Sequence, residues 1–399
     1  MPFISVEECI RTLVGQATIA KTNTTKTHIL NAKDKILATD VVADLDVPPA
    51  DNSPMDGYAL RSADVQTSKT LAISQRIQAG DVAKPLEKNT AARIFTGAEI
   101  PKGADTVEIQ ENCSADQKSV TFNEKVAAGM NIRRQGQDIA IGSVVVKKGQ
   151  RLRAQELGLL ASIGVKHVET YQPLKIAIVN TGNELVEPGQ PLKTGQIYNS
   201  NRYLINAILS GWGFHIEHCD IVADSLIETK SALAKISQTN DIVISSGGVS
   251  VGEEDHIKPA VDALGAINLW KVAIKPGKPF AFGHIANTAF IGLPGNPASV
   301  FVTLLVLARP YLLKQQGIGE NDLAINSHTA IANFERKASH REDYLRARYQ
   351  AGKVDIFPNQ SSGVLTSASW GNCFVKQTIG EEIKLNQPVT ILLYSDLFN

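Results

Sequence analysis

The sequence predicts a multidomain protein of α/β and β structure, centred on a doubly wound, mostly parallel α/β domain. From Leu174 to Leu313, short apolar runs alternate with amphipathic stretches, the pattern of a parallel sheet with helices on both faces. Before this region, segments such as Thr70–Ser74 alternate polar and apolar residues, which is typical of half-buried strands. The same alternation returns after about Ile325, so we expect a C-terminal domain that resembles a β-barrel.

The length and charge of the chain restrict the number of domains and the class of partner that we expect. The chain has 399 residues, of which 43% are hydrophobic and 20% charged, so we expect two to four ordinary globular domains. Lys+Arg and Asp+Glu are both 40, and this balance argues against a nucleic-acid partner.

The sequence predicts no membrane partner and a cytoplasmic location. Glu7, Glu8 and Arg11 interrupt any apolar leader. The longest apolar run, Ala298–Ala308, is shorter than the roughly 20 residues that cross a bilayer, so we predict a buried helix. The four cysteines lie far apart without CxxC spacing, which favours a reducing compartment.

The first half of the chain is predicted to hold one domain inserted into another. Ile4–Thr18 has the pattern of an amphipathic helix, and β-rich segments surround a second helix at Ala154–Ser162. Period-two alternation lies between these parts. We therefore assign residues 22–48 and 140–172 to a discontinuous N-terminal α/β linker domain, and residues 49–139 to an inserted all-β domain.

The central domain is assigned to residues 173–324, together with residues 5–21, and the C-terminal domain to residues 325–399. The predicted central strands are Leu174–Val179, His215–Val222, Asp241–Ser245, Trp270–Ile274, Ala289–Leu293 and a short one at Phe280–Phe282. The predicted helices are Asn201–Leu209, Ser225–Ser237, Ile257–Leu264 and Asn296–Leu313.

Polar, glycine-rich loops follow five of these strands. They begin near Thr181, Ala223, Ser245, Lys271 and Gly292. The carboxyl ends of strands in an open parallel sheet form the ligand crevice. Each loop alone is more often a plain turn, but five at one edge predict a site for a phosphorylated, anionic small molecule.

Backbone groups of two loops are suited to an anion. Gly247 and Gly248 permit positive φ and are expected to leave amides open to a phosphate. Asn296 is expected to cap the last helix, with Pro297 at its first position. The N-terminus of that helix would then add its partial positive charge to the crevice.

Charged side chains of both signs accompany these loops. Lys271 and Lys275 lie four residues apart, which places them on one face if the strand stays regular; Lys278 is either a third site charge or a surface charge. Carboxylates follow three strands: Glu184, Asp224 and Asp255. Carboxylates beside phosphate suit Mg²⁺.

The loop motifs, in their order, resemble the MoeA family of molybdenum cofactor enzymes. The motifs are TGNEL from Thr181, SSGGVSVGEED from Ser245, IKPGKP from Ile274 and GLPGNP from Gly292. The flanking domains agree through DNSPMDGYA from Asp51, RIFTGA from Arg93, NIRRQGQD from Asn131, REDYLR from Arg341 and the stretch Ser367–Cys373. The α/β domain alone also resembles MogA-like and CinA-type domains, but MDGYA and the flanking domains select MoeA.

The resemblance implies both an activity and an assembly. MoeA-like proteins are elongated homodimers of four-domain subunits that insert molybdenum from molybdate into adenylylated molybdopterin and release AMP. It therefore implies a Mg²⁺-dependent cytoplasmic transferase, with a MogA-like protein and acceptor molybdoenzymes as further partners. Tungstate stays an alternative to molybdate.

The resemblance also assigns roles to residues. Glu184, Asp224 and Asp255 would be catalytic and would hold the metal or molybdate region, while the catalytic Lys271 and Lys275 would hold phosphate or oxyanion. The pocket would be shaped by Gly247, Gly248, Ser250, Pro294 and Pro297. Asp56, Thr96 and Asp138 would close it from the partner subunit, and Arg346 and Ser367 would border it from the C-terminal domain. Asn183 stands where the family often has Asp, which makes it a weaker metal ligand than Glu184.

Two other functions remain open from the sequence. A nucleotide-sugar or NAD-linked enzyme could use the same sheet, although no GxGxxG turn follows the first strand and no Walker A loop occurs. A gephyrin-like scaffold, or a non-catalytic molybdopterin-binding paralogue, is the second alternative. The chain contains no long linker or fused MogA-like domain, which favours a dedicated enzyme.

Overall fold

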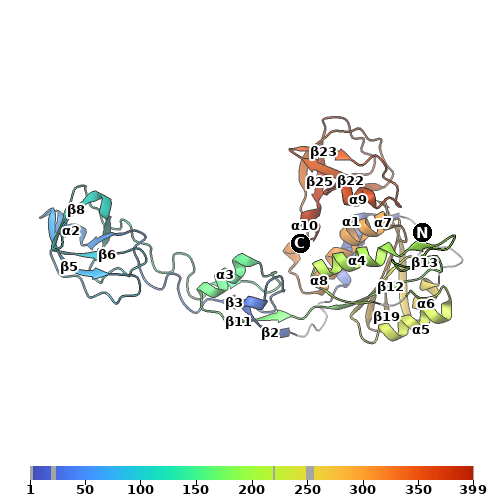
Figure 1. Ribbon diagram of the computed structural model, residues 1–399, viewed down its shortest axis with the longest axis horizontal. Coiled ribbons are helices and arrows are strands. Elements are labelled where there is room, and N and C mark those ends of the chain that lie inside the picture. Colours follow the sequence, from blue (N-terminus) through green and yellow to red (C-terminus); the bar gives the residue numbers. More distant parts are fainter. Residues whose placement is uncertain (1–2, 19–23, 219–220, 249–255, 399) are drawn as a thin grey trace.

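The computed structural model describes residues 3–18, 24–218, 221–248 and 256–398. The chain is elongated (Figure 1), with a small β domain at one end and the α/β domain and C-terminal β domain side by side at the other. A linker domain that carries α3 (Ala154–Ser162) lies between them. This helix has the predicted bounds.

The central domain contains one sheet of seven strands, in the order β1-β17-β19-β20-β16-β12-β15. Their bounds are β1 Phe3–Ile4, β12 Lys175–Asn180, β15 His215–His218, β16 Ile242–Ser246, β17 Gly265–Val272, β19 Pro279–Ile285 and β20 Thr288–Leu293. Only β19 runs antiparallel to its neighbours, and the other pairs are parallel, so the mostly parallel sheet is confirmed. Because β19 reverses direction between β17 and β20, the carboxyl ends of β12, β15, β16, β17 and β20 share one edge.

Helices cover both faces of this sheet, as predicted. They are α1 Val6–Gln16, α4 Ser200–Gly211, α5 Leu226–Ile236, α6 Ile257–Leu264, α7 Pro297–Thr303, a π segment Leu304–Ala308 and α8 Arg309–Gln315. Along β12, Ile176 and Ile178 pack with α1, α4 and the last helix. The alternate residues Ala177 and Val179 pack with α5 and α6. The period-two alternation of strand side chains explains this division.

The last helix runs from Pro297 to Gln315 and includes the π segment. By length and composition it could cross a membrane, with a mean hydropathy of 1.3, but 89% of its most apolar window is buried inside the structure. It is the core helix of this domain, and the predicted buried helix is confirmed.

Two strand predictions are corrected. β15 is described for His215–His218, and Cys219 and Asp220 lie outside the described residues; Ile221 is not in a strand, and Val222 forms only an isolated bridge with Thr181. The predicted strand Trp270–Ile274 is in fact divided: β17 ends at Val272, and Ile274–Lys275 form β18 in another sheet. The chain leaves the first sheet at Ala273, whose N–H donates to Ile4 and whose carbonyl accepts from the Glu342 N–H of the C-terminal domain.

The linker and inserted domains are built from short strands. In the linker, β2 (Thr24–His28) pairs with β11 (His167–Tyr171), and β3 (Val41–Val42) pairs with β10 (Val144–Val146). The inserted domain contains one six-stranded sheet, β7-β4-β6-β5-β9-β8. Its strands are β4 Gly57–Leu60, β5 Thr70–Ile77, β6 Thr90–Ile94, β7 Thr106–Ile109, β8 Cys113–Ala115 and β9 Ser119–Phe122, with α2 at Ser62–Val65.

The C-terminal domain is a closed barrel, as predicted. Its sheet runs β18-β22-β23-β21-β25-β24, and β24 also pairs with β22. The bounds are β21 His328–Ala332, β22 Glu342–Gln350, β23 Lys353–Ile356, β24 Cys373–Gln377 and β25 Pro388–Leu393, with α9 Thr366–Trp370 and α10 Tyr394–Phe398. The short pair β13 (Leu185–Val186) and β14 (Ile197–Tyr198) lies outside the large sheets.

The barrel is fixed against the α/β domain by buried hydrogen bonds. The Leu397 carbonyl accepts from Trp212 Nε1 and from Arg309 Nε, each at 3.0 Å. Burial lowers the pKa of Arg309 to about 10. Because these donors would be costly to bury unpaired, the contact sets the relative position of the two domains.

Candidate active site

The loops after β16 and β20 meet through glycines. Gly247 and Gly248 have φ of 87° and 69°, as predicted. A Cβ on Gly295 would lie 3.7 Å from the Gly247 Cα atom, so the two loops are in close contact. The Gly247 amide donates to the Leu293 carbonyl at 3.0 Å, so the prediction that this amide is open to an anion is wrong. The Gly247 N–H instead adds one hydrogen bond to the ladder between β16 and β20.

Two asparagines that were not predicted from the sequence as site residues contact these two loops. Asn201, at the start of α4, donates from Nδ2 to the Gly295 carbonyl at 2.7 Å. Asn180, the last residue of β12, donates to Ser246 Oγ at 2.6 Å. In the described part of the chain, Asn180 Oδ1 and Asn201 Oδ1 are buried without a partner. Ser245 Oγ is also buried without a partner among these residues, but Ser245 comes one residue before Ser246 and so faces the other side of the sheet. Buried groups of this kind are normally satisfied, so these atoms indicate a place for a ligand or water. The signal in the sequence was a polar residue that ends an apolar strand.

The loops of Glu184 and Asp224 are adjacent. Thr181 forms a parallel bridge with Val222, and the Asp224 N–H donates to Asn183 Oδ1 at 3.4 Å. The Glu184 carboxylate lies over the Cα atom of Gly182. Asp255 and Ser250 lie outside the described residues. Among those described, no group of three His, Cys, Asp or Glu side chains could hold a metal ion.

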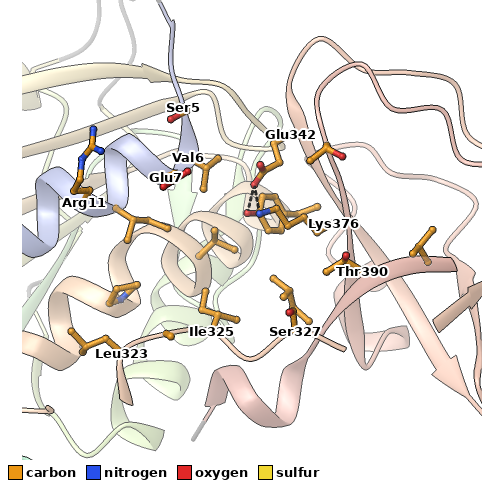
Figure 2. A pocket seen from close by; sticks show the side chains of 18 of the residues that line it. Ser5, Val6, Glu7, Arg11, Leu323, Ile325, Ser327, Glu342, Lys376 and Thr390 are labelled. Carbon is orange, nitrogen blue, oxygen red and sulfur yellow. Dashed lines mark hydrogen bonds and ion pairs between the residues drawn. The ribbon is translucent and has the colours of Figure 1, made fainter. Parts of the chain in front are cut away.

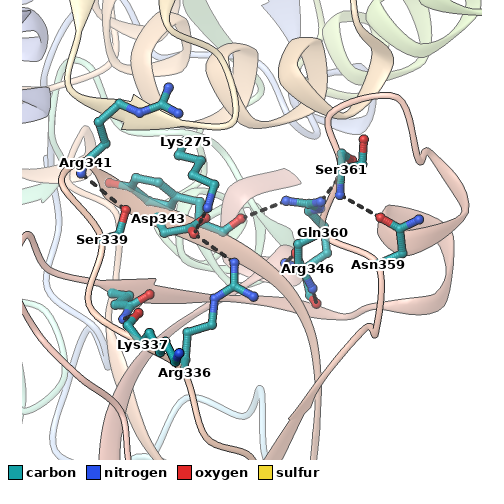
Figure 3. A network of polar contacts seen from close by, with 12 residues as sticks. Lys275, Arg336, Lys337, Ser339, Arg341, Asp343, Arg346, Asn359, Gln360 and Ser361 are labelled. Carbon is teal, nitrogen blue, oxygen red and sulfur yellow. Dashed lines mark hydrogen bonds and ion pairs between the residues drawn. The ribbon is translucent and has the colours of Figure 1, made fainter.

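The two predicted site lysines do not share a strand face. Lys271 lies on β17, paired with Phe3 and Pro279. Lys275 lies on β18 in the barrel sheet, and its Nζ is 3.1 Å from Asp343 Oδ2. Figure 3 shows this ammonium turned toward the C-terminal domain, where Arg336 binds the same carboxylate oxygen at 3.4 Å. The same-face prediction is therefore wrong, because the chain changes sheets at Ala273.

These charges border a hollow of about 580 Å³. Its lining includes Lys275, Asp343 and the basic side chains of Arg336, Lys337 and Arg341. Lys278 is exposed, with its ammonium 5.4 Å from the Phe3 ring centroid.

Asn296 occupies the N-cap position of α7, and Pro297 follows at the first helical position, as predicted. Its side chain makes no capping bond, however, and donates instead to Ser362 Oγ at 3.0 Å. The backbone N–H of Ala298, in the first turn of the helix, donates to the Ser362 carbonyl at 3.0 Å. The predicted side-chain cap is therefore wrong, because the C-terminal domain satisfies part of this helix end.

Arg346 and Ser367 lie behind that contact. Both are fully buried, and Arg346 Nε donates to Ser367 Oγ at 3.1 Å. Burial lowers the pKa of Arg346. The guanidinium also donates to the Ser361 carbonyl, so these residues support the loop that reaches α7.

Asp56 and Thr96 belong to the inserted domain at the other end of the molecule (Figure 1). Asp138 lies where that domain joins the linker domain, and its N–H donates to the Val47 carbonyl. Asp56 Oδ1 accepts from the Thr96 N–H and Oγ1–H, both at 2.8 Å, and these bonds lower the pKa of Asp56. Asp138 lines a hollow of about 370 Å³ with Arg133. Within one chain the inserted domain stands far from the α/β domain (Figure 1), so these residues are not brought to the crevice.

A larger groove of about 1200 Å³ lies elsewhere, between α1 and the C-terminal barrel (Figure 2). Glu7 and Arg11 line it on one side, and the ion pair of Glu342 with Lys376, at 3.5 Å, lies on the other. None of the glycine-rich loops contributes to it. The strand-end crevice is the better candidate because it combines close backbone approach, unpartnered buried polar atoms and charged groups.

Family models match three successive regions of the chain. They are described as the MoeA N-terminal region (domains I and II), residues 4–164, a probable molybdopterin binding domain, residues 177–314, and the MoeA C-terminal region (domain IV), residues 330–394. The crevice described above therefore lies mainly in the region that matches the molybdopterin binding domain.

Relatives and solved structures agree over nearly the whole chain. The chain is 39% identical to the molybdopterin molybdenumtransferase of Haemophilus influenzae, covering 88% of this chain and 89% of that protein. The match to the same-named protein of Nostoc sp. is 34% identical and covers 88% and 84%. These names favour the enzyme over the scaffold. The crystal structure of the molybdopterin biosynthesis MoeA protein from Pyrococcus horikoshii matches with a TM-score of 0.86 at 26% identity, covering 98% of this chain and all of that one. Sequence, domain order and fold thus agree, and the chain belongs to the MoeA family of molybdopterin molybdenumtransferases.

Proposed function

We propose that this protein inserts molybdenum from molybdate into adenylylated molybdopterin and releases AMP in molybdenum cofactor biosynthesis. The observation that carries the proposal is the contact of Gly247 with Gly295, beside which the Oδ1 atoms of Asn201, bonded to Gly295, and Asn180, bonded to Ser246, are buried without a partner. This contact lies in the region that matches a molybdopterin binding domain. Glycines let the backbone approach a phosphate closely, which side chains would prevent.

The residues of the chain would divide the chemistry between binding and charge neutralisation. When an oxygen of water or molybdate attacks the phosphoanhydride of the adenylylated substrate, a new P–O bond forms and AMP leaves with negative charge. Fixed cations beside the phosphoanhydride stabilise this charge. Lys271 lies near the carboxyl end of β17, and Lys275 is the last residue of β18. Lys275 would hold the oxyanion at the boundary between the crevice and the barrel.

The donor set suits Mg²⁺. Glu184 and Asp224 offer only carboxylate oxygens on adjacent loops, and hard oxygen ligands are what Mg²⁺ prefers. These two residues, with Asp255 from outside the described part, would hold the ion. When bound, Mg²⁺ would supply positive charge that offsets the phosphate oxygens.

A homodimer is part of the proposal. Asp56, Thr96 and Asp138 stand away from the crevice of their own chain (Figure 1), so a second copy would have to bring them there. The linker domain exposes apolar side chains, including Val42, Ile141 and Val144, which suits a surface covered by another subunit.

We also propose a cytoplasmic location. The described cysteines Cys9, Cys113 and Cys373 are free thiols, which fits a reducing compartment. A MogA-like partner and acceptor molybdoenzymes stay predictions of the family resemblance.

The test is AMP release by the purified chain supplied with adenylylated molybdopterin, Mg²⁺ and molybdate. We expect release that depends on molybdate and is not replaced by sulfate. Lys275→Ala should lower it by at least tenfold, because a charge at the reacting anion is removed. Lys353→Ala, which removes an exposed lysine on β23, is the matched control and should behave as wild type. Absence of molybdate-dependent AMP release would overturn the proposal.

A further inference from the structure

We propose that Ser362 is a positioning residue: it joins the C-terminal barrel to the loop after β20 and holds that loop in register with the Gly247 loop. The inference rests on the proposed function, since the loop forms one wall of the crevice. Ser362 lies between β23 and α9, in a segment that carries none of the predicted site residues.

Two hydrogen bonds connect Ser362 to the start of the core helix. Its hydroxyl oxygen accepts from Asn296 Nδ2 at 3.0 Å, and its carbonyl accepts from the Ala298 N–H at 3.0 Å. The two donors lie on either side of Pro297, which itself has no N–H to donate. Ser362 therefore binds the residues on both sides of Pro297, at the point where the loop becomes helix.

The segment that carries Ser362 is itself held rigidly. Gln360 accepts from the Arg346 N–H at 3.0 Å and donates back to the Arg346 carbonyl at 2.9 Å. The Arg346 guanidinium donates to the Ser361 carbonyl at 3.3 Å, and the Ser361 N–H donates to Asn359 Oδ1 at 3.0 Å. Figure 3 shows these contacts as one continuous network. Because Arg346 is fully buried, its donors are costly to leave unsatisfied, and the segment cannot move freely.

The loop after β20 connects Asn296, which Ser362 holds, to the glycine contact in the crevice. Gly295, one residue before Asn296, would place a Cβ 3.7 Å from the Gly247 Cα atom, and its carbonyl accepts from Asn201 at 2.7 Å. A shift at Asn296 would therefore alter the contact between the two glycines. Misplacement by about 1 Å can cost large factors in rate, whereas one lost hydrogen bond changes stability little. This difference separates positioning from a merely structural role.

The first test compares three serine variants in the AMP-release assay. Ser362→Ala should lower kcat roughly tenfold, with a small change in KM for molybdate and in the melting temperature. Ser362→Thr keeps the hydroxyl and should restore most of the rate. Ser369→Ala removes an exposed serine of α9, in the same domain, and should match wild type. Wild-type kcat in Ser362→Ala, or a Thr variant as slow as the Ala variant, would overturn the inference.

A double-mutant cycle tests the named bond. Asn296→Ala removes the same hydrogen bond from its other side, so Ser362→Ala should cause no further loss in that background. Additive losses would show that Ser362 acts through something else.

Hydrogen exchange gives a readout that does not depend on activity. In Ser362→Ala, amides of residues 292–298 and 246–248 should exchange faster, while those of the barrel strands stay protected. Unchanged exchange at both loops in Ser362→Ala would refute the inference, whatever the AMP-release assay gives. Conversely, faster exchange without any molybdate-dependent AMP release in wild type would refute the proposed function alone.

Discussion

At the residue scale, buried charge determines what the site residues can do. The Asp343 side chain is 1% exposed, and its Oδ2 forms ion pairs with both Lys275 and Arg336. Its Oδ1 has no hydrogen-bond partner among the described residues. A carboxylate in that position fixes the direction of the Lys275 ammonium. The lysine predicted from the sequence as an anion ligand is therefore held by a residue that sequence analysis did not select.

Removing this carboxylate should destabilise the protein. In Asp343→Ala, Lys275 and Arg336 face each other without a counter-charge, and we expect a loss of about 2 to 3 kcal/mol in the free energy of unfolding. This is less than for a fully buried pair, because Lys275 is 36% exposed. Urea denaturation measures the change. Asp355→Ala, an exposed carboxylate of the same barrel, is the control, and equal effects of the two variants would contradict the prediction.

The thiols should be unreactive in the folded protein. Burial, with a smaller contribution from nearby Glu8 at Cys9 and Glu108 at Cys113, raises the pKa of Cys9, Cys113 and Cys373 to about 12. In a Cys219→Ser background we expect no labelling of these thiols by iodoacetamide at pH 8, and full labelling after unfolding, since the thiolate is the reactive form. Peptide mass spectrometry measures this.

The same shift has a consequence for stability. The unfolded thiols ionise near pH 8.5 while the folded ones stay protonated to about pH 12. Their contribution to stability is therefore complete below about pH 8.5 and is lost as the pH rises toward 12. Stability that increases over this window in wild type relative to a Cys→Ala triple variant would contradict the assignment.

At the element scale, the loops of the crevice depend on glycines that tolerate no side chain. Gly277, between Lys275 and Lys278, has φ of 114°, and a Cβ there would collide with the Thr303 methyl group of the core helix. The loop is thus packed directly against α7. Lys275 of this loop is predicted from the sequence to hold an anion, and the glycine between the two lysines sets how closely the loop approaches the helix.

Gly277→Ala should therefore cost more than backbone strain alone. We expect about 1 to 2 kcal/mol from the positive φ and roughly 1 to 3 kcal/mol more from overpacking. Gly195→Ala is the matched control, because Gly195 also has positive φ, 83°, but open space around it. Adding Thr303→Ser, which removes the methyl group, should recover the overpacking part. Thermal or urea unfolding measures each value, and equal losses at the two glycines would refute the prediction.

At the scale of the whole molecule, the predicted site residues occupy two ends of one chain. Asp56 and Thr96 lie in the inserted domain and Lys275 lies at the α/β–barrel boundary (Figure 1). If both groups serve one reaction, two chains must contribute to each site.

Complementation tests this directly. Asp56→Ala and Lys275→Ala should each be inactive alone, but mixed subunits should regain about a quarter of wild-type activity. Half of the dimers would be hybrids and half of their sites intact. Dissociation and reassembly of the two proteins, followed by the AMP-release assay, measures the recovery. The double variant Asp56→Ala/Lys275→Ala mixed with itself is the control. Failure to recover activity in verified hybrids would contradict a site shared between chains.

The sequence by itself determined the fold class, the position of most elements and the loops that form the crevice. Apolar periodicity is a local property, so α3, α6 and the strands of the parallel sheet could be read from it. The rule that carboxyl ends of parallel strands share one edge was enough to bring the Gly247 and Gly295 loops together.

Only the tertiary structure decided which partners those residues take. The split between β17 and β18, the attachment of Asn296 to Ser362 and the pairing of Lys275 with Asp343 all involve contacts between segments far apart in the chain. Local pattern carries no information about such contacts, because a hydrogen-bond donor or a charge is satisfied by whichever group the folded domains place beside it. The sequence thus named the loops of the site, and the packing of the barrel against the α/β domain determined how they are held.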